Sequence, residues 1–254
     1  MDEVRNFDFS VANKLTLFSN GFTSNDMNFC ILGGVHSYLY NRALYQLGTE
    51  KHKDIYLRAV NMQDVGCFGL TELYHGSNVK GILTEARYDH NTKTFIIHTP
   101  KQEAMKFWIG AAAKTATSSV IWAQLYIENK CHGVHAFVVP LRDRKTLKTL
   151  PGVLIGDCGH KSGLNGVDNG FLLFEHVRIP KDNLLDRISG VDDSGNFRSI
   201  IQNEDKRFGL HLGALSGGRF FIGTNCSSLS LQALTIAIRY ANVRRQFKGS
   251  KDQE

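Results

Sequence analysis

The chain has 254 residues, of which 42% are hydrophobic and 21% charged, a composition typical of one large globular domain or two smaller ones. Its formal net charge of +6 is compatible with anionic ligands and equally with none. Lys and Arg form no dense run interleaved with aromatic residues, so nucleic acid is not a predicted partner. A basic cluster is predicted to be a solvated loop and comprises Arg142, Arg144, Lys145 and Lys148.

Cysteine usage and apolar runs restrict the class of protein further. The five cysteines include no C-x-x-C pair, so neither a metal site nor a disulfide framework is predicted, and a reducing compartment is favoured. The first residues, Met1, Asp2 and Glu3, lack the basic-then-apolar pattern of a secretory signal. The longest uncharged run, residues 220–238, contains several polar residues and predicts a buried helix rather than a membrane span.

Residues up to about 65 are predicted to be helical. The apolar residues that roughly follow a 3.6-residue period are Val35, Tyr38, Leu39, Leu44 and Leu47. Gly48 is predicted to end this helix, because glycine is a good C-cap residue. A second short helix is predicted to begin near Glu50.

Between about residues 66 and 180 the pattern changes to strands. Residues 86–88, 89–92 and 94–97 fit a strand, a turn and a second strand. Further strands are predicted at residues 120–127, 133–139 and 170–174, and together they favour a compact barrel or sandwich. From about Asn203 the chain is predicted to be helical again, with so little charge that the helix needs cover from other helices.

Residues 67–78 carry the most information about chemistry. An apolar run leads into Thr71 and Glu72 and then into a polar turn that contains Gly76. Such a segment can bring a hydroxyl, a carboxylate and free backbone N–H groups close together around a planar, electron-accepting cofactor. A strand followed by an ordinary turn has the same pattern, so both interpretations remain open at this level.

Residues 67–78 also resemble the Thr-Glu, Gly-His-Gly-Ser-Asn block of the peroxisomal acyl-CoA oxidases, with Tyr74 in place of the first glycine. These oxidases are flavoproteins related to the acyl-CoA dehydrogenases. Further family blocks follow in the family's order, at residues 47–52, 106–110, 135–140, 168–170, 178–180 and 236–247. The ordered series is more specific than any single block, and the chain looks closest to the acyl-CoA oxidase-like members.

The resemblance implies an α+β multidomain fold of the acyl-CoA dehydrogenase and oxidase type. Residues 1–65 would then be part of an N-terminal helical domain. Residues 66–200 would be a central β-barrel-like domain for flavin and acyl-CoA, and residues 201–254 the start of a C-terminal helical domain. On this comparison the chain looks shortened at both ends, and a homodimer is implied for the full-length family.

The implied function is that of an FAD-dependent acyl-CoA oxidase of fatty acid β-oxidation. In the family, a fatty acyl-CoA and molecular oxygen give trans-2-enoyl-CoA and hydrogen peroxide, and FAD supplies the redox chemistry. The family's glutamate base lies beyond the position that matches Phe247, so no catalytic residue is assigned and weak or absent activity is expected. Peroxisomal location is implied by the family, although the last residues are not a Ser-Lys-Leu address.

Two alternatives to an oxidase remain open. One is an acyl-CoA dehydrogenase, although the His75 to Asn78 block favours the oxidase. The other is a non-catalytic protein that uses the helical region 205–247 to pair with a complete family member.

The resemblance assigns two flavin contacts. Thr71 matches the family threonine whose hydroxyl contacts the flavin ring, and Gly110 matches the glycine whose backbone does. The usual oxidase has Trp-Trp-Pro-Gly-Gly around this glycine, whereas residues 107–111 are Phe-Trp-Ile-Gly-Ala. Ile109 removes the restriction of a proline and Ala111 restricts φ where glycine does not, so an altered loop is expected.

The neighbours of Thr71 are predicted to play lesser roles. If Thr71 faces the flavin, Glu72 points to the opposite side, because successive strand residues do, and is structural. His75 fits an ordinary turn histidine better than a phosphate ligand. Ser77 and Asn78 fit cofactor binding and local turn hydrogen bonding equally well.

Arg244 is the third candidate contact with the cofactor. Tyr240, Arg244 and Phe247 share one helical face by their spacing. In related enzymes, a helix of the neighbouring subunit offers an Arg-x-x-Phe pair to the flavin pyrophosphate, and arginine binds phosphate bidentately. A cationic helix C-terminus favoured by the macrodipole explains the same residues equally well.

Overall fold

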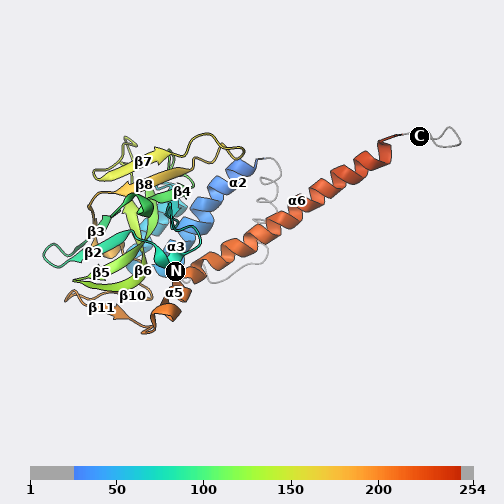
Figure 1. The fold of residues 1–254 in the computed structure, drawn as a ribbon. Coiled ribbons are helices and arrows are strands. Elements are labelled where there is room, and N and C mark those ends of the chain that lie inside the picture. The colour runs from blue at the N-terminus through green and yellow to red at the C-terminus, as the bar shows by residue number, and fades with distance from the viewer. Residues whose placement is uncertain (1–25, 247–254) are drawn as a thin grey trace. The chain divides into compact units, whose positions relative to one another are not determined.

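The computed structural model describes residues 26–246. They divide into two compact units: Asn28–Gly217 forms one, and the chain from Gly218 belongs to the other. The predicted boundaries at residues 65 and 200 stay predictions. The fold is of the α+β class expected from the sequence, with helices before and after a mixed β region (Figure 1).

The helices at the start of the described chain follow the predicted pattern. They are α2 (Met27–Gly34), a π-helical segment (Val35–Tyr40), α3 (Asn41–Leu47), a 3-10 turn (Glu50–His52) and α4 (Lys53–Val60). Gly48 caps α3 as predicted, and its N–H donates to the Leu44 carbonyl at 2.9 Å. Leu44 and Leu47 are buried, which confirms that the apolar stripe faces the core.

The largest sheet is organised around one long strand. Its members are β1 (Gly66–Gly69), β2 (Glu85–Asp89), β3 (Thr94–His98), β5 (Ser118–Ile127), β6 (Lys130–Pro140) and β9 (Val177–Pro180). β5 pairs in parallel with β1 and then with β2, while β6 pairs antiparallel with β5. β3 joins β2 to β9, which lies at the end of the strand order.

Two smaller sheets complete the β region. One contains β4 (Lys106–Ile109), β8 (Gly170–Phe174) and β7 (Val153–Asp157), and the other contains β10 (Ser189–Val191) and β11 (Phe197–Ser199). Figure 1 shows β4, β7 and β8 grouped at one end of this unit and β10 and β11 near α5 at the other. Every strand predicted from the sequence is present within the described residues.

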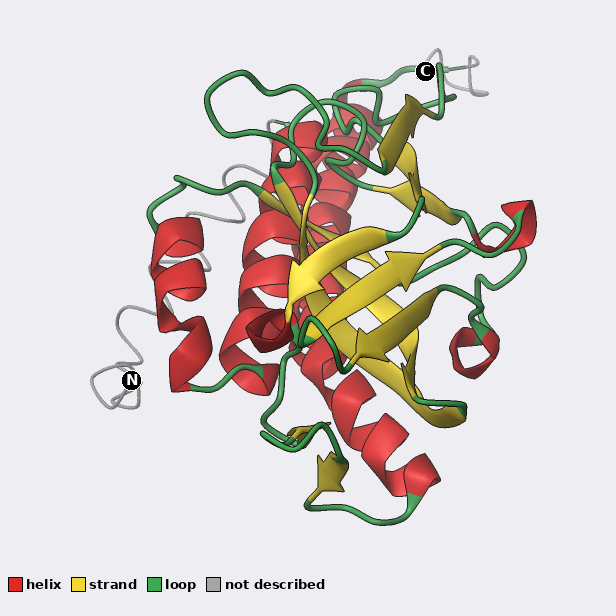
Figure 2. Cartoon of the chain, turned by 90° about the vertical axis from the view of Figure 1, so that its left-hand side faces the viewer, coloured by secondary structure: helices red, strands yellow, loops and turns green. Residues whose placement is uncertain are grey.

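Alternation along β5 separates two hydrophobic clusters. Ile121 and Ala123 face a cluster that includes Phe95, Phe137 and Leu172. Val120 and Trp122 face the other side, where the helices lie beside the strands (Figure 2). Because neighbouring strand residues point to opposite faces, one strand holds both layers in register. The β region is therefore packed on both sides of β5.

Tyr40 joins the helices to the sheet. Its side chain is fully buried, and its hydroxyl donates to Ser118 Oγ at 3.0 Å. A Cβ on Gly66 would lie 2.0 Å from the Tyr40 ring, so only glycine allows β1 to approach this closely. His36 also receives the Gly66 N–H at Nδ1, at 2.9 Å. These contacts fix the strand that leads directly to Thr71.

The chain after residue 203 is helical, as predicted. α5 (Glu204–Leu212) begins at Asn203, whose side chain accepts the Lys206 N–H at 2.9 Å, and it packs on β6. α6 (Ser216–Val243) is one long helix. Its apolar side chains are exposed rather than buried as predicted; Phe220 is 80% and Ile236 69% exposed. Apolar surface of this kind is typical of a helix that another element covers.

Within the described residues, α6 is long and apolar enough over Gly218–Val243 to cross a membrane. A core helix of a soluble protein meets the same criteria, so length and composition alone do not establish a membrane span.

Candidate functional site

Two segments far apart in the sequence lie side by side and bring the predicted flavin contacts together. Residues 71–73 run beside residues 105–107, where the Leu73 N–H donates to the Met105 carbonyl at 2.9 Å and the Phe107 N–H to the Thr71 carbonyl at 3.1 Å. Between these bonds, Glu72 forms a bridge with Lys106. This pairing places Thr71 beside Phe107, three residues before Gly110.

Glu72 is buried beneath this pairing and is held on every side. Its carboxylate accepts hydrogen bonds from the N–H and hydroxyl of Thr84 and from the Leu83 N–H, at 2.6–2.8 Å. His75 Nδ1 lies 2.9 Å from Glu72 Oε2, which confirms a local role for that histidine. Lys106 Nζ lies 3.1 Å from Glu72 Oε1. The prediction that Glu72 is structural is therefore confirmed.

Glu72 and Lys106 each stabilise the charged form of the other. Burial alone would raise the pKa of Glu72, but the charge of Lys106 and the hydrogen bonds from Thr84 and Leu83 outweigh it, and the pKa is lowered. Burial lowers the pKa of Lys106 to about 8, against the opposing effect of Glu72. At neutral pH the buried pair is thus ionised, and Glu72 is not free to take a proton from a substrate.

Thr71 lies on the other side of its segment from Glu72 and is partly exposed. Its hydroxyl donates to the Phe107 carbonyl at 2.9 Å. The hydroxyl proton is therefore used within the protein, and the oxygen lone pairs remain to accept a hydrogen bond from a ligand. Ser77 and Asn78 are exposed in the following turn, so both interpretations of them stay open.

Trp108 lies between Phe107, which pairs with Thr71, and the predicted flavin contact at Gly110. It lies where the pairing of β4 with β8 is irregular, its φ is +65°, and its side chain is 52% exposed. Asn169 Nδ2 donates to the Trp108 carbonyl at 3.3 Å and holds this backbone. A left-handed backbone costs a bulky residue roughly 1–3 kcal/mol and clusters at functional sites. An exposed indole held at that cost is suited to lie against a flat ring.

Ala111, in the loop that follows Trp108, adopts a backbone conformation that the family glycine could also adopt, so the expected alteration of the loop stays a prediction. Ala111 has φ of +67°, a conformation that glycine adopts freely and alanine does not. Gly110 itself has a different explanation: a Cβ there would lie 3.1 Å from Val35 Cγ2. The missing side chain of Gly110 thus accommodates the chain's own Val35, and a cofactor contact through the Gly110 backbone stays a prediction.

A cavity of about 320 Å³ lies beside Trp108. Its wall contains Val167 and Asn169 together with a polar loop at residues 160–164. The Lys161 ammonium donates to the Val167 carbonyl at 2.8 Å, so this lysine orders the loop. The site therefore offers an exposed aromatic side chain, a partly exposed hydroxyl and a cavity wall with polar groups.

Arg142 corrects the prediction that the basic cluster is a solvated loop. Its guanidinium is buried and donates to the carbonyls of Ala112, Ala113 and Ala116. All three acceptors lie in the loop after Gly110, so Arg142 holds that loop in place. Sequence spacing gave no sign of this role, because the acceptors are backbone atoms. Lys145 and Lys148 are exposed, as predicted.

Arg244, the third predicted contact, belongs to a different compact unit from Thr71 and Gly110. It follows α6 in the other compact unit, is exposed, and its N–H donates to the Tyr240 carbonyl at 2.9 Å. Its role at a cofactor pyrophosphate stays a prediction. Phe247 lies outside the described residues.

Comparison with known proteins defines the class to which this fold and site belong. The structure of acyl-CoA oxidase 3 from Yarrowia lipolytica superposes with a TM-score of 0.87 at 39% identity, over 95% of this chain and 35% of that one. Acyl-CoA oxidase-2 of Caenorhabditis elegans, a structure bound with FAD, ascaroside-CoA and ATP, gives 0.81 at 33% identity, over 87% and 33%. The profile of the acyl-CoA oxidase C-alpha1 domain matches residues 212–254.

Sequence relatives agree with the structures. Peroxisomal acyl-coenzyme A oxidase 3 of Homo sapiens is 45% identical over 222 residues, 87% of this chain and 32% of that protein. Acyl-coenzyme A oxidase 2, peroxisomal, of Arabidopsis thaliana is 45% identical over 238 residues, 91% and 34%. The chain belongs to the acyl-CoA oxidase family, and it spans about a third of the length of these curated relatives.

The expected closeness to the oxidase-like members is not seen in the identities. The acyl-coenzyme A oxidase-like protein of Mus musculus is 40% identical over 230 residues, below the 45% of the human oxidase. The resemblance therefore holds for the family as a whole, with the oxidase-like protein included.

Proposed function

We propose that this chain forms the flavin-facing β surface of an FAD-dependent acyl-CoA oxidase. The observation that carries the proposal is Trp108, exposed and held in a left-handed conformation at the edge of the segment that pairs with Thr71. The family, together with the FAD in one relative's structure, supports a flavin as the flat ring. The relatives are oxidases, which favours this reading over a dehydrogenase.

The described residues fit such a ring on one side. Trp108 would pack against its plane, and the Thr71 oxygen, whose proton is donated to Phe107, would accept a hydrogen bond from its edge. The Gly110 backbone is the third contact, and Arg244 of a neighbouring subunit would meet the pyrophosphate. When bound, FAD supplies the redox chemistry, in which a hydride is accepted from the substrate and then passed to molecular oxygen.

We propose that the base that removes the substrate proton lies outside the part of the family's sequence that this chain matches. Glu72, the carboxylate next to Thr71, is fully engaged by Lys106 and Thr84. The substrate class is fatty acyl-CoA and the location is the peroxisome, as the names of the relatives imply. We therefore expect the chain alone to bind FAD and to release little hydrogen peroxide with palmitoyl-CoA.

A flavin titration tests the proposal. Residues 1–254 mixed with FAD should show flavin absorption that co-elutes with the protein, and Trp108→Ala should lower the affinity about tenfold or more, because stacking of this kind contributes roughly 1–3 kcal/mol. Tyr74→Ala is the matched control, since Tyr74 is an exposed aromatic residue in the neighbouring segment. Equal loss in both variants, or no bound flavin at saturating FAD, would reject the function.

A second candidate is a non-catalytic protein that pairs with a complete oxidase through α6. The exposed apolar side chains of α6, including Phe220 and Ile236, favour an interaction of this kind. Co-purification with a complete oxidase, without bound flavin in this chain, would support the second candidate over the first.

A further inference from the structure

One cavity in the described chain is lined by several charged groups. It has a volume of about 590 Å³ and lies where the end of α4, the end of β6 and the loop after β6 meet. We call it the arginine cavity; its charged lining residues are Arg58, Asp64, Arg142, Arg144, Lys145 and Asp143. Thr71, Trp108 and Gly110 do not line it.

One buried carboxylate arranges two of these arginines. The Asp64 side chain is 3% exposed, and its Oδ2 accepts from Arg58 Nε at 3.0 Å. Arg144 binds the same carboxylate with Nε and, at 2.9 Å, with Nη2. Asp64 thus holds both guanidinium groups in place at the wall of the cavity. Little side-chain freedom is left for a ligand to restrict.

The arginines keep donors that Asp64 does not occupy. Within the described chain, no partner is recorded for the terminal nitrogens of Arg58, for Nη1 of Arg144 or for the Lys145 ammonium. Asp143 Oδ1 accepts the Thr146 N–H at 2.7 Å and the Lys145 N–H at 3.1 Å within its own loop. The lining carries four cationic side chains and two carboxylates, an excess of two positive charges.

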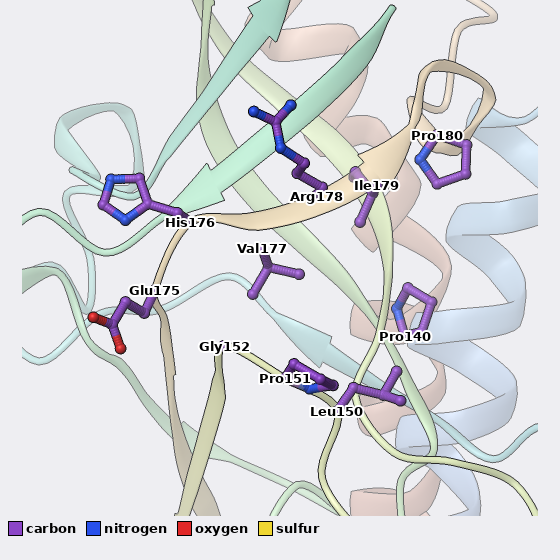
Figure 3. A pocket seen from close by; sticks show the side chains of 10 residues that line it. All are labelled: Pro140, Leu150, Pro151, Gly152, Glu175, His176, Val177, Arg178, Ile179 and Pro180. Atoms are coloured by element: carbon purple, nitrogen blue, oxygen red, sulfur yellow. The ribbon is translucent and has the colours of Figure 1, made fainter. Parts of the chain in front are cut away.

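A neighbouring hollow provides a comparison for the charges that line the arginine cavity. The hollow has a volume of about 470 Å³ and shares Pro140, Leu150 and Pro180 with the arginine cavity (Figure 3). Figure 3 shows Arg178 pointing to the opposite side of β9 from Val177. Arg178 Nη1 is already bonded to Asp89 at 2.8 Å, and to Thr92 and Thr94 at 3.1 and 3.2 Å. Among the described residues that line this hollow, Arg178 is the only arginine or lysine and Glu175 is also present, whereas four cationic side chains line the arginine cavity.

We propose that the arginine cavity binds the phosphate groups of a small organic phosphate. Guanidinium groups recognise phosphate oxygens bidentately, and two of them fixed around one carboxylate, with a lysine beside them, suit a diphosphate. The cavity is larger than a phosphate alone requires, and the apolar wall of Ile55, Val138 and Leu150 can receive the organic part. This binding needs neither bound flavin nor turnover.

Calorimetric titration of residues 1–254 with inorganic pyrophosphate, without flavin, tests the proposal. We expect saturable binding that Arg144→Gln weakens about tenfold, the loss typical of a charge-assisted contact. Arg178→Gln is the matched control, because the two side chains are 54% and 53% exposed and each is paired with one aspartate. Lys145→Gln breaks no recorded side-chain hydrogen bond of the described chain and should weaken binding about threefold without affecting the fold.

The outcomes separate the proposal from its rivals. ADP should bind at least as tightly as pyrophosphate, and markedly weaker ADP binding would overturn an organic ligand. Absence of saturation, or equal weakening by Arg144→Gln and Arg178→Gln, would reduce the cavity to a structural ion cluster. Loss of pyrophosphate binding at saturating FAD would assign the arginines to the flavin's own diphosphate and overturn an additional site.

Discussion

Two buried polar clusters in the Asn28–Gly217 unit differ in whether their side chains are charged: one is ionised and the other is neutral. Glu72 and Lys106 lie 3.1 Å apart and stay ionised, because each carries the charge that the other needs. His135 and His211 are buried with ring centroids 5.1 Å apart, and neither has a carboxylate partner in the described chain. Burial depth is similar in the two clusters. The partner, rather than the depth, decides whether a buried group keeps its charge.

The histidine cluster is built to remain neutral. His135 lies 2.9 Å from the Gly133 carbonyl and 2.7 Å from Ser189 Oγ, and His211 lies 3.1 Å from the Val134 carbonyl. Burial lowers the pKa of His135 well below its usual value and that of His211 to about 4. Electrostatic interactions with His211, Arg207 and His132 add to the lowering of the pKa of His135. Protonating this cluster would therefore oppose the packing of α5 on β6.

Removal of one charge from the ionised pair should have the largest effect. Lys106→Met leaves the Glu72 carboxylate buried without its cation, and we expect the free energy of unfolding to fall by about 3–5 kcal/mol. Urea denaturation at pH 7 measures the loss. The double variant Glu72→Gln, Lys106→Met should recover at least about 1 kcal/mol, because it also removes the buried charge. If the double variant were the sum of the single variants, the two groups would not act as a pair.

Acid should affect the two clusters in different pH ranges. Between pH 6.5 and about 4, the unfolded chain binds a proton at His211 that the folded chain does not, so stability falls as the pH falls. For this histidine alone, the loss from pH 7 to pH 5 is about 2 kcal/mol. Glu72 contributes stability above its unfolded pKa of about 4.5, and this contribution is lost only at lower pH, as its lowered folded pKa is reached.

The variant His211→Gln tests whether the histidine cluster causes the loss of stability between pH 7 and pH 5. Glutamine keeps a donor for the Val134 carbonyl but cannot titrate, so the dependence of stability on pH between 7 and 5 should flatten by about 2 kcal/mol. Denaturation midpoints at the two pH values give the slope. The matched control is His160→Gln, since His160 is exposed on a loop and should leave the slope unchanged. An unchanged slope in His211→Gln would show that His211 is not held neutral by the fold.

The smallest expected effect is at the strained loop of the flavin site. Trp108→Gly should raise the stability of the chain by about 0.5–1 kcal/mol, because glycine adopts φ of +65° without strain, and it should lower FAD affinity about tenfold or more, as expected for Trp108→Ala. Ala111→Gly relieves a similar strain but keeps the indole, so it should retain FAD binding. Melting temperature and flavin titration measure the two effects separately. Loss of flavin in both variants would assign the role to the loop conformation instead of the indole.

The sequence predicted regular structure better than it predicted the site. The strand at residues 120–127, rich in β-branched and aromatic residues, and the helix end at Gly48 follow from local rules, and both are confirmed. The burial of Glu72 was predictable from its position next to Thr71. The identity of its partner was not, because Lys106 is 34 residues away and meets Glu72 only when β4 forms.

Two features depend on long-range pairing that no local pattern encodes. Trp108 acquires its left-handed backbone from an irregular ladder with β8, more than 60 residues later. Arg142 was assigned to a solvated loop because its neighbours are basic, yet it reaches backbone carbonyls about 30 residues earlier. Carbonyl acceptors are present at every residue, so the sequence holds no sign of which ones an arginine will use.

The parallel pairing of β1 with β5 has a consequence for biosynthesis. Gly66 meets its partner Ser118 only 52 residues later, whereas β5 and β6 are joined by a short turn and can pair as soon as both leave the ribosome. The apolar strand β1 therefore remains unpaired with β5 while the intervening chain is synthesised. Slow translation between residues 70 and 118 would prolong that interval and make the nascent chain depend on chaperones, with Tyr40 and its helix as the only early cover described for β1.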